Sequence, residues 1–188
     1  MINIELEDGT TLEVYQDDCP SSPREWCNLG TMVCFHGSHD LGDEHDYNQS
    51  DYNSWDELES AIIKENDVAV ILPLYLYDHS GITMNTTGFS CRWDSGQVGF
   101  VYISKAKIRE EYSVKRISAK LKKRIEGYLV SEVNTYDQYL VGDVYGFNIE
   151  YSDGDSDSCS GYYGTDIETN GILDEIPKKY HKEILAAT

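Results

Sequence analysis

The first residues of the chain alternate between apolar and polar side chains in two short runs. Residues 2–6 and 12–14 place isoleucine, leucine or valine at every second position, and Asp8-Gly9 lies between the two runs. An Asp-Gly pair between alternating segments is the usual signal of a tight hairpin turn. The pattern therefore predicts an N-terminal β-hairpin, and residues 31–36 have the composition of a third strand.

The middle of the chain begins with a predicted helix and continues with strands. Ser54 followed by Glu57 is a capping-box pattern at the start of a short run of helical periodicity. Residues 68–72 form a continuous apolar run, which is typical of a buried central strand. Residues 81–94 are polar and leave room for one short strand, whereas residues 97–104 alternate again and predict another strand.

The last third of the chain predicts helices and two further strands. A short helix follows Ser104, and apolar residues at helical spacing predict a longer helix over 118–139. Residues 144–151 and 159–164 have the pattern of strands joined by the intervening loop, and two helical pieces flank Pro177. This order of elements predicts an α+β fold with a largely antiparallel sheet and helices packed on one face. With 188 residues and no long linker, we expect a single domain over residues 1–188.

Composition indicates a protein of a reducing compartment. Hydrophobic residues make up 40% of the chain, which is enough for a packed core, and no apolar run approaches the roughly 20 residues that span a bilayer. The N-terminus lacks the pattern of a signal peptide. Cysteine occurs five times, without C-x-x-C spacing, which favours free thiols over a disulfide framework. We therefore expect a protein of a reducing cytoplasm.

Charge is the most unusual property of the sequence. The formal net charge is −19, and it is unevenly distributed: residues 1–67 carry −15, 68–126 carry +5, 127–177 carry −11 and 178–188 carry +2. A field of this sign repels nucleic acid and anionic membranes and attracts basic surfaces. The alternative is that the charge serves only solubility.

The acidic side chains concentrate in two polar segments, residues 37–53 and 152–158. Unbroken loops as long as the first are uncommon and often functional. We predict that these segments carry the partner-binding residues, with two tyrosines supplying apolar contact area. The predicted residues are Asp40, Asp43, Glu44, Asp46, Tyr47, Asp51, Tyr52, Asp153, Asp155 and Asp157.

Three histidines lie within the first acidic segment. His36 and His39 could hold a divalent metal ion with a third ligand from His45 or a carboxylate. The spacing fits no established metal motif, so the interpretation is a solvated acidic loop, and we expect no metal ion and no cofactor.

Asp153, Asp155 and Asp157 imitate the first three ligands of a calcium-binding loop. The pattern fails at the sixth position, where Ser158 replaces glycine, and at the twelfth, where Gly164 replaces glutamate. A polar hairpin loop is the better interpretation.

An enzymatic alternative rests on a thiol and an imidazole. Cys91 paired with His79 could act as a nucleophile, although no third orienting group can be identified, and Asp78-His79-Ser80 are too close in sequence to form a triad. The alternative function is therefore a small hydrolase or nucleotide-modifying enzyme that uses His79 and Cys91, or His36, His39 and His45.

Nine lysines and arginines lie between residues 105 and 124. Alone they would suggest a nucleic-acid-binding patch. The overall charge of −19 instead favours internal salt bridges or a self-complementary homo-oligomer and disfavours direct nucleic-acid binding.

Several motifs in one order resemble a known family. They are SPREW and NLGTMVC (22–34), LPLYLYDHSG (72–81), WDSGQVGF (93–100), and YDQYL with GDVYG (136–146). This set resembles a family of small, mostly uncharacterised proteins encoded by phages, plasmids and conjugative elements, chiefly of Gram-positive bacteria. The resemblance covers about residues 20–165 and implies a mobile-element context rather than an activity. The histidine-rich stretch 36–45 departs from the family pattern, which puts a metal role further in doubt.

Small acidic proteins of mobile elements are often inhibitors of host defence nucleases, and some imitate DNA. The leading hypothesis is therefore a counter-defence protein, such as an anti-CRISPR, that binds a host nuclease. The target would be a Cas9-type effector or a restriction enzyme, bound through its basic groove in place of nucleic acid. The remaining hypothesis is a non-enzymatic interaction protein of the element.

Overall fold

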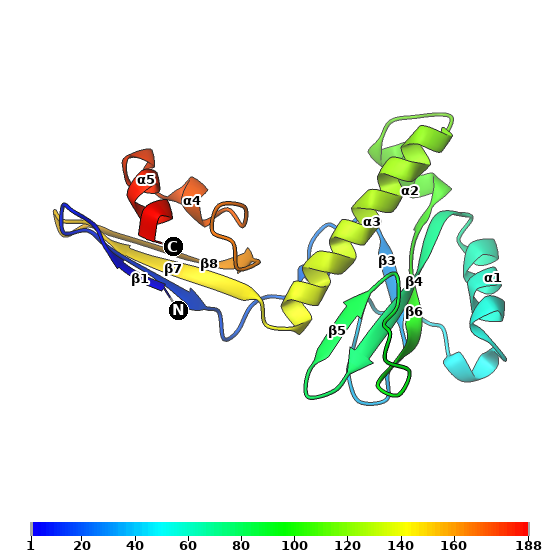
Figure 1. The fold of residues 1–188 in the computed structure, drawn as a ribbon. Coiled ribbons are helices and arrows are strands. Elements are labelled where there is room, and N and C mark those ends of the chain that lie inside the picture. The colour runs from blue at the N-terminus through cyan, green and yellow to red at the C-terminus, as the bar shows by residue number, and fades with distance from the viewer. Residues whose placement is uncertain (1, 188) are drawn as a thin grey trace. The chain divides into compact units, whose positions relative to one another are not determined.

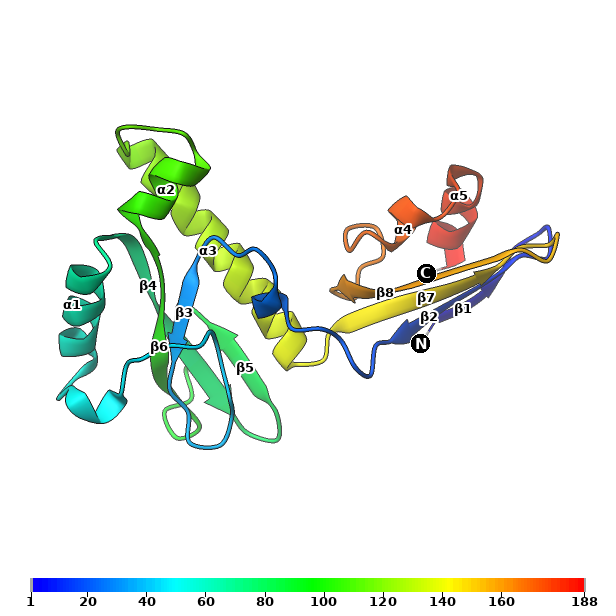
Figure 2. The same ribbon diagram turned by 180° about the vertical axis from the view of Figure 1, so that it is seen from behind.

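The computed structural model describes residues 2–187 and is a mixed α+β fold. Within these residues it contains five α-helices and two four-stranded antiparallel sheets, which confirms the predicted fold class (Figures 1 and 2). None of the helices described is both long enough and apolar enough to cross a membrane.

Contacts within the chain divide it into two compact units. Unit 1 combines both ends of the sequence, residues 1–22 and 138–188, and unit 2 is the continuous segment 23–137. Each unit is built around its own sheet.

Unit 1 contains sheet A, with strand order β1-β2-β7-β8. The strands are β1 (Ile2–Glu5), β2 (Thr11–Gln16), β7 (Val144–Glu150) and β8 (Ser156–Tyr163). The predicted hairpin is present, and Gly9 takes a left-handed conformation (φ 87°) in its turn. The central pair, β2 with β7, joins segments from the two ends of the chain, for example through Glu13 and Asn148, which are 135 residues apart.

One face of sheet A is covered by the C-terminal helices. These are α4 (Ile172–Glu175) and α5 (Lys178–Ala187), which flank Pro177 as predicted (Figure 1). Ile149 from β7 and Ile184 from α5 are both fully buried in the resulting core. Burial of such a side chain contributes about 1.5–3 kcal/mol.

Unit 2 contains sheet B, with strand order β3-β6-β4-β5. The strands are β3 (Thr31–Cys34), β6 (Ser95–Ser104), β4 (Val68–Asp78) and β5 (Ile82–Asn85). Strand β4 continues beyond the predicted run 68–72 and passes through Pro73. Pro73 pairs in register with Phe100 of β6 and lies two residues before the pairing of β4 with β5 begins at Tyr75, and a proline is tolerated where one side of a strand is unpaired.

Helices lie on both faces of sheet B. Helix α1 (Trp55–Glu65) buries Leu58 and Ile62 against Phe100. The opposite face is covered by α3 (Ala119–Leu140), which reaches the backbone of β5, where the Met84 amide donates to Asp137. Helix α2 (Lys105–Glu111) follows β6 directly and is capped by Ser104, as predicted. Two short 3-10 turns, Pro23–Glu25 and Gln49–Asp51, lie in the connections.

Candidate functional site

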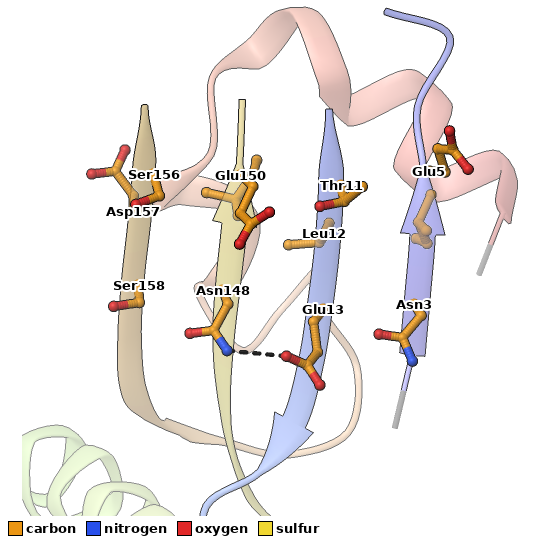
Figure 3. Close-up of a pocket in the computed structure, with 12 residues that line it drawn as sticks. Asn3, Glu5, Thr11, Leu12, Glu13, Asn148, Glu150, Ser156, Asp157 and Ser158 are labelled. Atoms are coloured by element: carbon orange, nitrogen blue, oxygen red, sulfur yellow. Dashed lines mark hydrogen bonds between the residues drawn. The ribbon is translucent and has the colours of Figure 1, made fainter. Parts of the chain in front are cut away.

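The uncovered face of sheet A carries polar and acidic side chains in two rows across its four strands (Figure 3). The first row is Asn3, Glu13, Asn148 and Ser158, and the second is Glu5, Thr11, Glu150 and Ser156. These residues alternate along the strands with buried core residues such as Ile4, Leu12 and Ile149. The strand period of two therefore presents every polar side chain of the rows on the same face.

Three carboxylates lie on this face without a basic neighbour in either row. Glu13 on β2 is the diagonal neighbour of both Glu5 on β1 and Glu150 on β7, and such diagonal neighbours are about 7–8 Å apart across the strands. The amide of Asn148 donates to Glu13 over 3.1 Å. A shallow depression of about 720 Å³ lies over these strands. Because the carboxylates stand on a paired sheet rather than on a loop, their spacing is fixed by the ladder.

The hairpin loop between β7 and β8 adds further acids to unit 1. Asp153 and Asp155 lie in this loop, whereas Asp157, which was expected there, is the second residue of β8 and pairs with Ile149; all three are exposed. The backbone closes tightly here, because the Tyr151 amide donates to Asp155 and Gly154 takes a left-handed conformation (φ 93°). Asp157 accepts a hydrogen bond from the Tyr151 hydroxyl at 3.0 Å. Asp153 accepts from the Asp155 amide over 3.2 Å, and neither residue forms an ion pair among residues 2–187.

Asp43, in the first acidic segment, is engaged inside unit 2. Arg24 donates to both of its carboxylate oxygens, over 2.8 and 2.6 Å, and the Met32 amide donates to it over 2.8 Å. The Arg24 side chain is only 6% exposed. This carboxylate anchors the loop, and its role in the structure differs from that of its exposed neighbours.

The other predicted residues of segment 37–53 divide into exposed acids and half-buried rings. Asp40, Glu44, Asp46 and Asp51 are exposed. Tyr47 and Tyr52 instead pack against the core between α1 and sheet B. The Tyr47 hydroxyl accepts from Asn66 over 2.8 Å, and burial raises the pKa of Tyr47 to about 12. The two tyrosines therefore contribute mainly to packing, and the four exposed acids are the residues of this segment that a partner could reach.

The structure brings His36 and His39 together with a carboxylate that the sequence did not single out as their partner. Both Nε2 atoms face Asp78 Oδ2, over 3.6 and 3.9 Å, and the two rings stack with centroids 4.9 Å apart. The possible ligand atoms lie within 4.8 Å of one another, so these three residues have the composition of a metal site.

The hydrogen bonds of His36 oppose a metal ion at this cluster. Its Nδ1 accepts from the backbone amides of Ser38 and His39, over 3.3 and 3.2 Å. A neutral imidazole has one proton, so an accepting Nδ1 leaves the proton on Nε2, the atom that would have to bind the metal. Metal binding would require the proton to move and the turn to open.

His45 is not part of this cluster. Its Nε2 lies 3.0 Å from the Cys34 carbonyl oxygen, and its ring packs edge-on against Phe35. The adjoining Cys34 thiol is buried, and loss of solvation raises its pKa to about 12. The Cys34 thiol is therefore not arranged for nucleophilic attack, and the buried Nδ1 of His45 has no hydrogen-bond partner among residues 2–187.

The second enzymatic pair, His79 and Cys91, lies at the same end of sheet B. Asp94 separates the pair: its Oδ2 is 3.7 Å from His79 Nδ1 and accepts from the Cys91 thiol over 3.5 Å. A nucleophilic relay needs the imidazole between the thiol and the carboxylate. Here the Asp94 carboxylate faces both groups. The Cys91 thiol therefore donates to Asp94 and not to the His79 imidazole.

The acidic face of sheet A was not among the predicted site residues. Its signal was present in the alternation at Asn3 and Glu5, Thr11 and Glu13, and Asn148 and Glu150. What the sequence could not show is that strands from the two ends of the chain pair and align these alternations into common rows.

Comparison with known proteins gives no relative: no family model matches the chain, and no match was found among curated proteins or solved structures. The resemblance to mobile-element proteins therefore stays a prediction.

Proposed function

We propose that this protein is a binding protein that occupies the basic nucleic-acid groove of a host nuclease, in a counter-defence role such as that of an anti-CRISPR. The observation that carries the proposal is the open face of sheet A, where three carboxylates stand in fixed rows with no lysine or arginine among them. The partner chemistry that fits this face is a surface rich in lysine and arginine.

The charge of unit 1 supports this proposal. Residues 1–22 and 138–188 contain 16 acidic and 3 basic side chains, a net charge of −13. A nuclease neutralises nucleic acid with lysine and arginine, and nucleic-acid binding releases condensed counterions. A surface with ordered carboxylates can compete for the same basic groups, and its field accelerates the encounter.

The enzymatic alternative receives less support from the geometry. His79 and Cys91 are separated by Asp94, and the proton of His36 is held on the atom that would bind a metal ion. By contrast, the acidic face of unit 1 needs no rearrangement to bind a basic surface. We therefore prefer binding to catalysis.

The experiment is affinity capture from a Gram-positive host lysate, followed by displacement with duplex DNA. The immobilised proteins are the wild type, the face variant Glu5→Gln/Glu13→Gln/Glu150→Gln, and the matched control Glu7→Gln/Glu168→Gln/Glu175→Gln. The control removes the same charge from exposed residues of unit 1 outside the two rows.

We expect the wild type and the control to retain nucleases that added DNA displaces, and the face variant to lose them. Purified nucleases from that fraction should then cleave DNA more slowly when the wild type is added. Retention that DNA does not compete with, or equal capture by the face variant, would refute the proposal.

A further inference from the structure

The basic residues of unit 2 gather at one end of that unit and are not neutralised there. Residues 105–124 contain nine lysines and arginines and two glutamates, a net charge of +7. The rest of unit 2 carries 16 acids and 3 bases. Despite this excess of acid, Lys105 with Asp67 is the one ion pair that this stretch forms among residues 2–187. The expected internal salt bridging is therefore largely missing from the described residues.

The start of helix α3 places lysines where they oppose the helix dipole. Lys120, Lys122 and Lys123 lie in or next to its first turn, which contains no acidic residue. Positive charge at a helix N-terminus is unfavourable, and acids are the residues that stabilise this position. The arrangement lowers the stability of the free protein and would be relieved by a bound anion.

An aromatic groove of about 370 Å³ adjoins these bases. Trp26, Tyr112 and Tyr128 line it, and Trp26 and Tyr128 are 51% and 39% exposed. Arg124 lies 5.9 Å from the ring centroid of Tyr112 and 5.3 Å from that of Tyr128, and its Nε and Nη2 donate to the Tyr128 hydroxyl over 2.9 and 2.6 Å. Because Lys120, Arg124 and Tyr128 are four residues apart on α3, they form one stripe that leads from the basic end into the groove.

The wall of the groove is held firmly. Glu132 accepts from the amides of Leu29 and Gly30, over 2.5 and 2.9 Å, which fixes the segment after Trp26 against α3. Lys107 donates to the Asn28 carbonyl over 2.8 Å and ties the same segment to α2. The exposed rings therefore stand on a scaffold that is already formed.

We propose that this groove binds single-stranded nucleic acid, with phosphates on Lys120 and Arg124 and bases stacked on Trp26 and Tyr128. Single strands offer both flat rings and a regular row of negative charges, and exposed aromatics beside lysines are the usual platform for them. A duplex hides its base faces. The acidic face of a second copy offers charge to the lysines but no planar rings to the groove.

The overall charge of −19 does not prevent such binding at physiological salt, because fields from charges beyond about 8 Å are largely screened. The inference is independent of the proposed function, since it uses unit 2 rather than the acidic face of unit 1.

The test is fluorescence anisotropy with labelled oligothymidylate and oligouridylate, at several salt concentrations. The variants are Lys120→Gln/Arg124→Gln, Trp26→Ala and the conservative Trp26→Phe. The matched control, Lys178→Gln/Lys182→Gln, removes two exposed lysines of unit 1. Circular dichroism and thermal unfolding establish that every variant is folded.

We expect the wild type and the control to bind both oligonucleotides. Trp26→Ala should weaken binding about 5- to 150-fold, as loss of one stacked base predicts, and Trp26→Phe should restore most of it. Lys120→Gln/Arg124→Gln should lower the slope of log K against log salt by about 1.4, the value for two lost phosphate contacts.

Three results would overturn the proposal. The first is an absence of oligonucleotide binding by the wild type at low salt. The second is equal affinity for an oligonucleotide and for inorganic polyphosphate, which would show that the rings take no part. The third is self-association that disappears in Lys120→Gln/Arg124→Gln while oligonucleotides do not bind, because the surface would then belong to a second copy.

Discussion

Arg24 and Asp43 form a two-pronged ion pair inside unit 2, with Nε and Nη2 of the arginine 2.8 and 2.6 Å from the two carboxylate oxygens. The guanidinium also donates to the Gly30 carbonyl over 2.9 Å, and the carboxylate accepts from the Met32 amide. One pair thus fastens the turn before β3 to the acidic loop that follows it. Planar, two-pronged geometry is the reason that arginine, rather than lysine, suits this position.

We predict that Asp43→Asn destabilises the protein by about 1.5–3 kcal/mol, because it replaces the charged acceptor of two hydrogen bonds from a buried guanidinium, which keeps Glu132 at 3.8 Å. The matched control is Asp40→Asn, which removes an exposed carboxylate of the same loop and should change stability by less than about 0.5 kcal/mol. Urea unfolding measures both values. Equal stability of the two variants would show that the ion pair does not hold the loop.

The sequence was most informative where the interactions are local. The Asp8-Gly9 turn is present, and the Ser54 hydroxyl accepts from the Glu57 amide as a capping residue does. One detail differs: Glu57 reaches back to the amide of Asn53, at 2.7 Å, rather than to that of Ser54. The box is displaced by one residue because the Asn53 side chain offers a second donor to the same oxygen.

Prediction was weakest where segments distant in sequence meet. The acidic face of unit 1 depends on the pairing of β2 with β7, and no local signal specifies that register. Strand β8 begins at Ser156, earlier than expected, because its first residues are polar and exposed and lack the apolar alternation of a half-buried strand. Asp43 was grouped with the exposed acids since its partner, Arg24, lies 19 residues away.

A second prediction concerns acid sensitivity at the start of α1. Hydrogen bonds from the Asn53 amide and side chain hold the pKa of Glu57 below its usual value of 4.5. A lowered folded-state pKa gives stability that is present above pH 4.5 and is lost as pH falls through the folded-state value. Glu57→Gln should therefore lower the melting temperature at pH 7 and flatten its fall below pH 4.5. Thermal melts of the wild type and of Glu57→Gln from pH 7 to pH 3 measure this. If the melting temperatures of the two proteins fall in parallel with pH, the prediction is wrong.

A third prediction concerns the cysteines, all of which are free thiols in the structure. Mass spectrometry without reductant should find five free thiols. Cys19, Cys27 and Cys159 are exposed and should react rapidly with a thiol reagent, whereas Cys34 should react only on unfolding, because it is buried and its pKa is raised to about 12. A native disulfide, or rapid labelling of Cys34 in the folded protein, would contradict this.

A fourth prediction is that the cluster of His36, His39 and Asp78 binds no stoichiometric zinc. The Nδ1 of His36 accepts two backbone amides, so its Nε2 carries the proton. Isothermal titration with zinc should give no one-to-one binding in wild type. Tight one-to-one binding that His39→Ala abolishes would refute the prediction and favour the enzymatic alternative. In that event the 36–39 turn must open, and NMR shifts of the Ser38 amide would report it.

The last prediction separates the two kinds of acidic surface by their kinetics. Glu5, Glu13 and Glu150 stand on a sheet, whereas Asp40, Glu44, Asp46 and Asp51 lie in an irregular segment of unit 2. Exposed charges that stand outside a binding face act mainly through the long-range field, which governs association and is screened by salt. Contacts fixed on a rigid face govern dissociation.

We therefore expect the loop variant Asp40→Asn/Glu44→Gln/Asp46→Asn/Asp51→Asn to slow association with the captured nuclease at low salt and to match wild type at high salt. The face variant should dissociate faster at every salt concentration. Surface plasmon resonance over a salt series measures both rates. Asp43 is left unchanged, because its substitution would unfold the loop and confuse the comparison. If both variants bind with wild-type rates at all salt concentrations, the protein does not act through its carboxylates, and imitation of DNA is the wrong mechanism even for a protein that inhibits a nuclease.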